Sequence, residues 1–502
     1  MFWIRTTDGL WTDPLNWSGG VLPGPNDNVI LDVSPVDVTV THATGTIQMK
    51  SLIANESLKV TGGILEVAGA IQINQDFTLD GGTIKGRSVT QNGGARLIIT
   101  ADGGNTLDGV SLNSGLDLTG ARVRIRNGLT LSGSVLLDRN GTLTFAGDQT
   151  FDNSSVVFAG NSGFLIIEGN ATLTLGPAMV VRGKSGTIGV GLGGANKIIN
   201  QGLIAADVAG GTLYIISTLF INEADLRAIN GGSLTINSAN WSNPGRIEAS
   251  GGAALTLNRT GSNSGSIDAS TGATLTLNGT WNNKGTMNAN AATVNLDGTF
   301  TLEQLGAFNR TGGTVTLGAG GVLDLSGATL ALDGRTGPWT LNGGTIKGGS
   351  VTQNGGAKLI ITNNGGNTLD GVRVNADLDL TGARLRIRNG LTLSGSVLLD
   401  NGGTLTFAGN QTFDNGSVVF VGTSGTLGVE DKSTLTLGPN AVVRGRTGTI
   451  GQPLLAGQTN KLINQGLISA DVAGGTLTIK PTVFENTGKV EEKNGGKVVI
   501  VP

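Results

Sequence analysis

Residues 241–289 read WSNPGRIEASGGAALTLNRTGSNSGSIDASTGATLTLNGTWNNKGTMNA, and their internal repetition specifies the fold. A unit of about twenty residues begins here as WSNPG, returns as GSNSG and returns again as WNNKG. Successive side chains of a strand point to opposite sides, so Ile247 and Ala249 share an inward face while Glu248 faces outward. One such unit cannot enclose a hydrophobic core, but parallel copies stacked on one another can. The stretch therefore predicts a parallel β-solenoid.

An asparagine recurs at the same place in each unit. Within residues 198–300 its spacings are 22, 21, 20 and 20 residues, and two more copies follow near the end of the chain. We expect these side chains to face inward at a corner of the coil, where amides of neighbouring coils can form a hydrogen-bonded ladder. The expected ladder residues are Asn200, Asn222, Asn243, Asn263, Asn283, Asn464 and Asn486.

A longer repeat is superimposed on the short one. The segment DGGTIKGRSVTQNGGARLIIT, which contains Gly81, returns 262 residues later as NGGTIKGGSVTQNGGAKLIIT, which contains Gly343. A duplication of about 140 residues explains this match. The duplicated blocks are 79–221 and 341–485, with short coils of about twenty residues over 222–300 between them.

The first 45 residues differ from the rest, since they hold three of the six tryptophans and four of the eleven prolines. The end of a solenoid exposes its core and an unpaired strand edge, which must be covered. We therefore expect residues 1–45 to form an N-terminal cap and residues 46–502 to form a continuous solenoid. An antiparallel β-sandwich or propeller is the competing all-β fold.

Composition excludes several classes of protein. The 85 glycines among 502 residues lack the three-residue period of collagen, and 38% apolar with 14% charged residues is not the composition of a disordered chain. A net charge of −3 disfavours nucleic-acid binding, and no apolar run is long enough to cross a bilayer, so we expect no membrane insertion. The start of the chain lacks the pattern of a signal peptide, which leaves a cytosolic protein, a mature form or an excised segment.

Catalytic motifs were sought and none was found, so we expect a protein that is not an enzyme. There is no cysteine, and the single histidine, His42, lies in TVTHATG, where a structural role is favoured over that of a base. Acidic residues such as Asp108 and Asp370 occur singly at turns, without the clusters that polysaccharide lyases and hydrolases require. We expect no catalytic residue, no metal and no cofactor.

Alternating arginines form the strongest candidate ligand site. In RVRIR the three arginines share one face of a strand, and the second block repeats the pattern as RLRIR. Such a stripe can bind carboxylates or sulfates of an acidic polysaccharide, because guanidinium pairs bidentately with these groups. The alternative is a solvated face paired with Asp or Glu of neighbouring coils. The candidate residues are Arg122, Arg124, Arg126, Arg384, Arg386 and Arg388.

The string WTDPLNWSGGVLPGPNDNVIL, at residues 11–31, resembles the segment that precedes β-helical repeats in large bacterial surface and secreted proteins. The asparagine-glycine units are similar to those of filamentous-haemagglutinin-like exoproteins and autotransporter passengers. The resemblance implies a right-handed parallel β-helix that serves at the bacterial cell surface or outside the cell as an adhesin, stalk or fibre.

We therefore expect a non-enzymatic structural or adhesive element located outside the cell or on its surface. The alternative is a carbohydrate-binding or carbohydrate-active β-helix that acts on an acidic polysaccharide. The C-terminal sequence KVEEKNGGKVVIVP, residues 489–502, continues the repeat into an apolar strand. An uncovered strand edge is a template for pairing, so we also expect head-to-tail self-association or membership of a larger repeat array. Surface glycans are the other expected partners.

Overall fold

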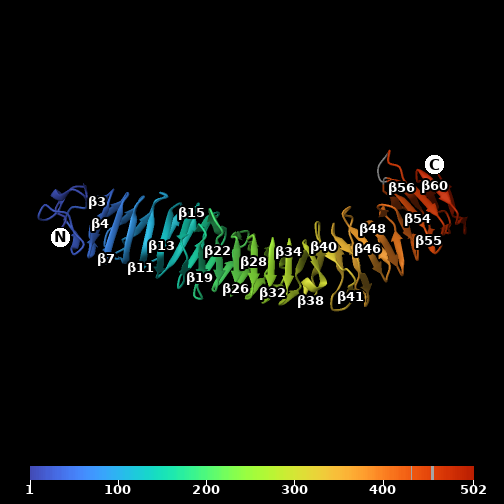
Figure 1. Ribbon diagram of the computed structural model, residues 1–502, viewed down its shortest axis with the longest axis horizontal. Helices are drawn as coiled ribbons and strands as arrows, with labels where there is room; N and C mark the ends of the chain where they lie inside the picture. Colours follow the sequence, from blue (N-terminus) through green and yellow to red (C-terminus); the bar gives the residue numbers. More distant parts are fainter. Residues whose placement is uncertain (431, 454–456, 502) are drawn as a thin grey trace. The chain divides into compact units, whose positions relative to one another are not determined.

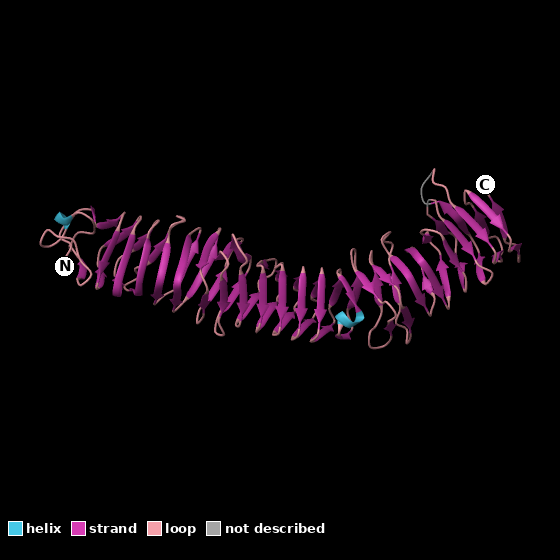
Figure 2. Ribbon diagram, viewed as in Figure 1, coloured by secondary structure: helices cyan, strands magenta, loops and turns pink. Residues whose placement is uncertain are grey.

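The computed structural model describes residues 1–430, 432–453 and 457–501. Strands account for 57% of the chain and helix for 1%, which confirms an all-β protein (Figure 2). The chain divides into two compact units, Met1–Asp268 and Ala269–Pro502. Each unit is a parallel β-solenoid in which strands stack as successive rungs (Figure 1), and the chain makes about 22 turns of about 21 residues. The expected parallel solenoid is therefore confirmed.

A regular coil contains three short strands joined by turns. One coil of the first unit comprises β25 (Leu219–Asn222), β26 (Asp225–Ala228) and β27 (Ser233–Ile236), and the next comprises β28 (Asn240–Asn243), β29 (Arg246–Ala249) and β30 (Ala254–Leu257). Each strand pairs in parallel with its counterpart on the next coil. The register places Leu226 opposite Ile247, so the apolar positions of successive coils stack in the interior.

The core is narrow, and one glycine shows how closely it is filled. Trp241 is 4% exposed and lies in register with Gly261 of the next coil. A Cβ atom on Gly261 would lie 1.8 Å from Cε2 of the Trp241 indole. The unit GSNSG therefore has glycine where its neighbour WSNPG has tryptophan because the indole occupies the space of both rungs.

The N-terminal segment lies against the edge of the first coils. Strand β1 (Gly9–Leu10) pairs with β3 (Thr39–His42), and Phe2 bridges Ile30 of β2 (Asn28–Leu31). A short 3-10 helix spans Pro14–Asn16. The three tryptophans of this segment are buried and pack against one another. The ring centroids lie 5.1 Å apart for Trp3 and Trp17 and 4.6 Å apart for Trp11 and Trp17. The tryptophans thus form a small aromatic core of their own.

The two duplicated blocks contain matching strands in the same order. In the first unit the arginine-bearing face comprises β11 (Thr106–Leu112), β13 (Arg122–Leu131), β15 (Gly141–Ala146), β18 (Gly163–Glu168), β21 (Gly186–Leu192) and β24 (Thr212–Ile215). In the second unit the corresponding face comprises β46 (Thr368–Val374), β48 (Arg384–Leu393), β50 (Gly403–Phe407), β53 (Gly425–Val429), β56 (Gly448–Pro453) and β59 (Thr476–Ile479).

The other two faces of the blocks match as well. In the first unit they comprise β12 (Leu116–Thr119), β14 (Ser134–Asp138), β17 (Ser155–Phe158), β20 (Val180–Gly183) and β23 (Leu203–Ala206), and β16 (Gln149–Phe151), β19 (Thr172–Leu175) and β22 (Lys197–Asn200). Their counterparts in the second unit are β47 (Leu378–Asp379), β49 (Ser396–Leu399), β52 (Gly416–Phe420), β55 (Ala441–Gly445) and β58 (Leu467–Ala470), and β51 (Gln411–Phe413), β54 (Thr434–Leu437) and β57 (Lys461–Asn464).

Candidate functional site

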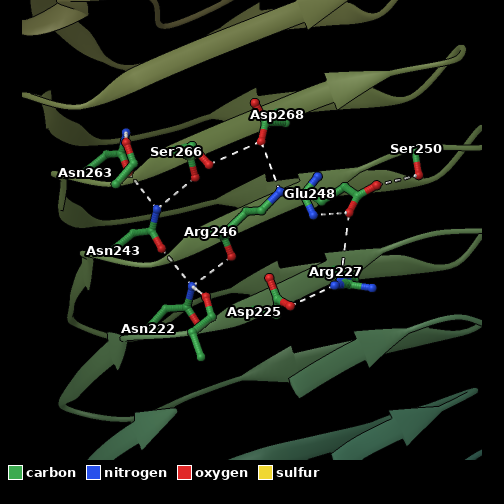
Figure 3. A network of polar contacts seen from close by, with 12 residues as sticks. Asn222, Asp225, Arg227, Asn243, Arg246, Glu248, Ser250, Asn263, Ser266 and Asp268 are labelled. Carbon is green, nitrogen blue, oxygen red and sulfur yellow. Dashed lines mark hydrogen bonds and ion pairs between the residues drawn. The ribbon is translucent and has the colours of Figure 1, made fainter. Parts of the chain in front are cut away.

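Six of the seven asparagines expected to form a ladder are buried, and Figure 3 shows three of them, Asn222, Asn243 and Asn263, on successive coils. The seventh, Asn486, is exposed, so the expectation of an inward side chain is wrong for this residue. In the first unit, Asn200 Nδ2 donates to Asn222 Oδ1 at 2.7 Å. Asn222 Nδ2 donates to Asn243 Oδ1 at 2.7 Å, and Asn243 Nδ2 donates to Asn263 Oδ1 at 2.6 Å. Each amide also donates to a backbone carbonyl; for example, Asn243 Nδ2 donates to the Ser266 carbonyl at 3.0 Å. The structure thus brings four of the expected residues into one hydrogen-bonded row.

In the second unit the asparagines lie in two separate places. Asn464 Nδ2 donates to Asn486 Oδ1 at 2.7 Å, so these two form a rung. Asn283 Nδ2 instead donates to the Leu305 carbonyl at 2.9 Å. The next coil carries the helical turn α1 (Leu302–Leu305) at this corner, so a backbone carbonyl takes the place of an amide oxygen.

The first asparagine of each row carries a buried oxygen without a described partner. Oδ1 of Asn200 and Oδ1 of Asn464 accept no hydrogen bond from any residue that the structure describes. The preceding coil places Leu175 in register with Asn200 and Leu437 in register with Asn464. A leucine offers no donor, so each row begins where an apolar corner gives way to a polar one.

Charged side chains form a network on the outer face beside the ladder (Figure 3). Arg246 lies 2.9 Å from a Glu248 oxygen and 3.3 Å from an Asp268 oxygen. Arg227 lies 2.7 Å from an Asp225 oxygen and 3.8 Å from Glu248. Exposed pairs of this kind contribute about 0–1 kcal/mol each. The network is therefore a solvated surface and gives no sign of a binding site.

Strand β13 presents its three arginines on the outside, and a sharp turn in the middle of the strand is held from both sides. Asn127 has a φ of 54°, and its Nδ2 donates to Asp108 Oδ1 at 2.5 Å. Gln149 Oε1 accepts from the Gly128 backbone N–H at 3.0 Å, and Gln149 Nε2 donates to the Ile125 carbonyl at 3.0 Å. The second block repeats these bonds through Asn389, Asp370, Gly390, Gln411 and Ile387.

The central arginine of each stripe is held by a glutamate two coils further along. Arg124 Nε and Nη2 donate to Glu168 Oε2 at 2.6 and 2.5 Å. Arg386 Nε and Nη2 donate to the two oxygens of Glu430 at 2.5 and 2.6 Å. The hydrogen bonds that Arg386 donates to Glu430 raise the pKa of the Arg386 guanidinium, so its charge is secured. Arg124 and Arg386 therefore each form an ion pair with a glutamate of their own unit.

The outer arginines of the stripes are exposed. Arg122 and Arg126 make no ion pair with any described residue of the first unit, and the same holds for Arg384 and Arg388 in the second. Arg126 lies in register with Asp108 of the preceding coil. Arg122 lies at the other end of the stripe, beside the turn that contains Gly103.

A shallow groove runs along this outer face in each unit. The groove of the first unit has a volume of about 560 Å³, and that of the second has a volume of about 370 Å³. Both are lined by equivalent groups, namely the first two arginines, two threonines and the glutamate. These shared residues are Arg122, Arg124, Thr142, Thr144 and Glu168 in the first unit and Arg384, Arg386, Thr404, Thr406 and Glu430 in the second.

The chemistry available in the grooves is anion recognition. The exposed guanidinium offers donors in a planar fork, and the central arginine is already paired with the glutamate. No group of three or more His, Asp or Glu side chains in the described residues could hold a metal ion. No helix among those residues has the length and apolar character needed to cross a membrane.

Comparison of the chain with models of protein families, with curated proteins and with solved structures finds no match. The features that bear on function are therefore those of the chain itself. Sequence reasoning missed Glu168 and Glu430 as partners of the central arginines. Their separation of 262 residues, equal to that of the arginine stripes, was a signal that could have revealed them.

Proposed function

We propose that the protein is a non-enzymatic structural and adhesive element, acting outside the cell or on its surface, whose two arginine grooves bind an acidic polysaccharide. The observation that carries the proposal is the recurrence of one groove in both duplicated blocks. In each, an exposed arginine that forms no ion pair with a described residue stands next to an arginine held by glutamate. The same arrangement of charges is present in both copies of the duplicated block.

The grooves suit a repeating anion. Arg122 and Arg384 each present a guanidinium that can take a carboxylate or sulfate bidentately, and threonine hydroxyls lie on the adjoining rungs. Two equivalent sites on one chain raise the affinity for a polymer that reaches both, because the second contact is then intramolecular. The whole chain has a net charge of −3, so attraction depends on these local sites.

Binding of the 502-residue chain to immobilised polygalacturonate, hyaluronate and heparin, with neutral dextran as reference, tests the proposal. We expect binding to at least one acidic polymer that weakens with salt, and about tenfold weaker binding for the double variant Arg122→Ala, Arg384→Ala. The matched control is Arg335→Ala, which removes an exposed arginine outside both grooves. Absence of binding to all three polymers, or an equal loss in the control, would refute the proposal.

Incubation of the same polymers with the protein distinguishes adhesion from catalysis. A non-enzymatic element leaves the length distribution of the polysaccharide unchanged, as size-exclusion chromatography would show. Shortening of the polymer would instead favour a carbohydrate-active β-helix.

A further inference from the structure

The two grooves share their charges but differ in the row of side chains that leads away from the exposed arginine. In the second unit every residue of the row after the arginine is a threonine, and each lies in register with the next from strand to strand. Its members are Arg384, Thr404, Thr426, Thr449 and Thr478. In the first unit aromatic residues replace two of these threonines. That row comprises Arg122, Thr142, Phe164, Thr187 and Tyr214.

The two aromatic side chains of the first unit lie on the outside, where the core does not use them. Tyr214 is the single tyrosine of the chain and is 43% exposed, and Phe164 is half-buried. Both line a small hollow of about 210 Å³ together with Thr187, which lies between them. Phe164 also lines the larger groove that contains Arg122, so the two hollows adjoin at this ring.

Apolar side chains extend the aromatic surface on one side. Strand β21 contains a bulge at Gly189, which has a φ of 88°. The extra residue turns Val190 and Leu192 outward, next to Ile166, and Leu192 is 55% exposed. In the second groove Gln452 stands in place of Val190 and Gly428 in place of Ile166, so these two apolar side chains are missing there.

The spacing of the rings suits a sugar chain. Phe164 and Tyr214 are two rungs apart, which corresponds to about 10 Å at the spacing of hydrogen-bonded strands. This is close to the length of two sugar rings in an extended polysaccharide, whose C–H faces are apolar and stack on aromatic rings. The Thr187 hydroxyl on the rung between the rings can hydrogen-bond to a hydroxyl group of the sugar.

We propose that the groove of the first unit is a subsite row for an extended acidic polysaccharide, with sugar rings stacked on Phe164 and Tyr214 and a carboxylate or sulfate on Arg122. The inference rests on the proposed function and adds the sugar-ring contacts to it. The second groove, with threonine at both ring positions, binds the same anions by charge alone and more weakly.

Reciprocal exchange between the two blocks tests the inference, because each block supplies the matched control for the other. In the 502-residue chain, Phe164→Thr and Tyr214→Thr convert the first row to the second, while Thr426→Phe and Thr478→Tyr do the reverse. Titration calorimetry with defined hexasaccharides of hyaluronate and of heparin measures both sites. We expect the first pair of changes to weaken the tighter site about tenfold and the second pair to strengthen the weaker site.

A small polyanion without sugar rings provides the second arm. Inorganic triphosphate should bind the arginines of both grooves, and the aromatic exchanges should leave its affinity unchanged. Unchanged hexasaccharide affinity in the exchange variants, with binding still dependent on Arg122, would overturn the inference while leaving the proposed function intact. Concentration-dependent self-association that disappears in the Phe164→Thr, Tyr214→Thr variant would also overturn it, since the aromatic surface would then be a contact between copies of the chain.

Discussion

Replacing Asn243 by alanine tests whether the asparagine ladder stabilises the solenoid. Asn243 is 1% exposed, and its side chain takes part in three hydrogen bonds. Its Oδ1 accepts from Asn222 at 2.7 Å, and its Nδ2 donates to Asn263 Oδ1 at 2.6 Å and to the Ser266 carbonyl at 3.0 Å. Alanine removes all three bonds and leaves the backbone of β28 free to pair as before.

The magnitude follows from these bonds and from what the neighbours retain. A buried hydrogen bond contributes about 0.5–1.5 kcal/mol net. Asn222 Nδ2 keeps its bonds to the Ala224 and Arg246 carbonyls, both at 3.0 Å, so it is not left without partners. We therefore expect Asn243→Ala to lower the free energy of unfolding by about 2–4 kcal/mol.

Aspartate at the same position separates hydrogen bonding from packing. An ionised aspartate side chain has almost the shape of asparagine but no donor, so Asn243→Asp should destabilise more than Asn243→Ala at pH 7. Burial raises the pKa of such a carboxyl in the folded state, and a protonated carboxyl regains one donor. The difference between the two variants should therefore shrink as the pH falls.

Urea unfolding followed by circular dichroism gives the loss of stability, and hydrogen exchange of the β28 and β29 amides shows whether the loss is local. Exchange is needed because coils of a solenoid can open separately. The control is Asn240→Ala, which changes an exposed asparagine of the same strand and for which we expect a change within about 0.5 kcal/mol. Equal stability and equal exchange for the two alanine variants would refute the role of the ladder.

Four further predictions concern packing, pH and association. Gly261→Ala places a Cβ 1.8 Å from the Trp241 indole, and we expect it to lower the free energy of unfolding by about 1–3 kcal/mol in urea titration. Burial lowers the pKa of His42, so the unfolded chain binds more protons than the folded chain as the pH falls. The free energy of unfolding, measured by urea titration, should therefore fall as the pH drops below about 6.5, and His42→Leu should flatten this dependence. Hydrogen bonds from two lysines and a serine lower the pKa of Glu491 to about 2, so its contribution to stability is present above pH 4.5 and is lost towards pH 2. Hydrogen exchange of the β61 (Lys489–Glu492) amides should speed up as the pH falls over that range, and Glu491→Gln should remove this pH dependence. Head-to-tail association predicts oligomers that grow with concentration in sedimentation velocity, and a single monomeric species at every concentration would contradict it.

The architecture of the coil could be predicted from the sequence alone. Period-two alternation, as in Ile247 and Ala249 against Glu248, assigns the inward face without any knowledge of partners, because strand geometry alone sets it. The repeat length then requires stacking, since one coil cannot enclose a core. The constant spacing of Asn222, Asn243 and Asn263 placed these residues at one corner for the same reason.

Which outer residues meet is a property of the tertiary structure and could not be read from the repeats. Glu168 pairs with Arg124 across 44 residues, and Phe164, Thr187 and Tyr214 align although their separations of 23 and 27 residues differ from the 20 to 22 of the ladder. The turns between strands differ in length, and β21 contains a bulge at Gly189. The number of residues between two positions therefore does not tell which outer residues lie opposite each other on neighbouring coils. The register depends on which apolar side chains pack inward against the next coil and on the geometry of the turns, and both are settled only when the coils stack.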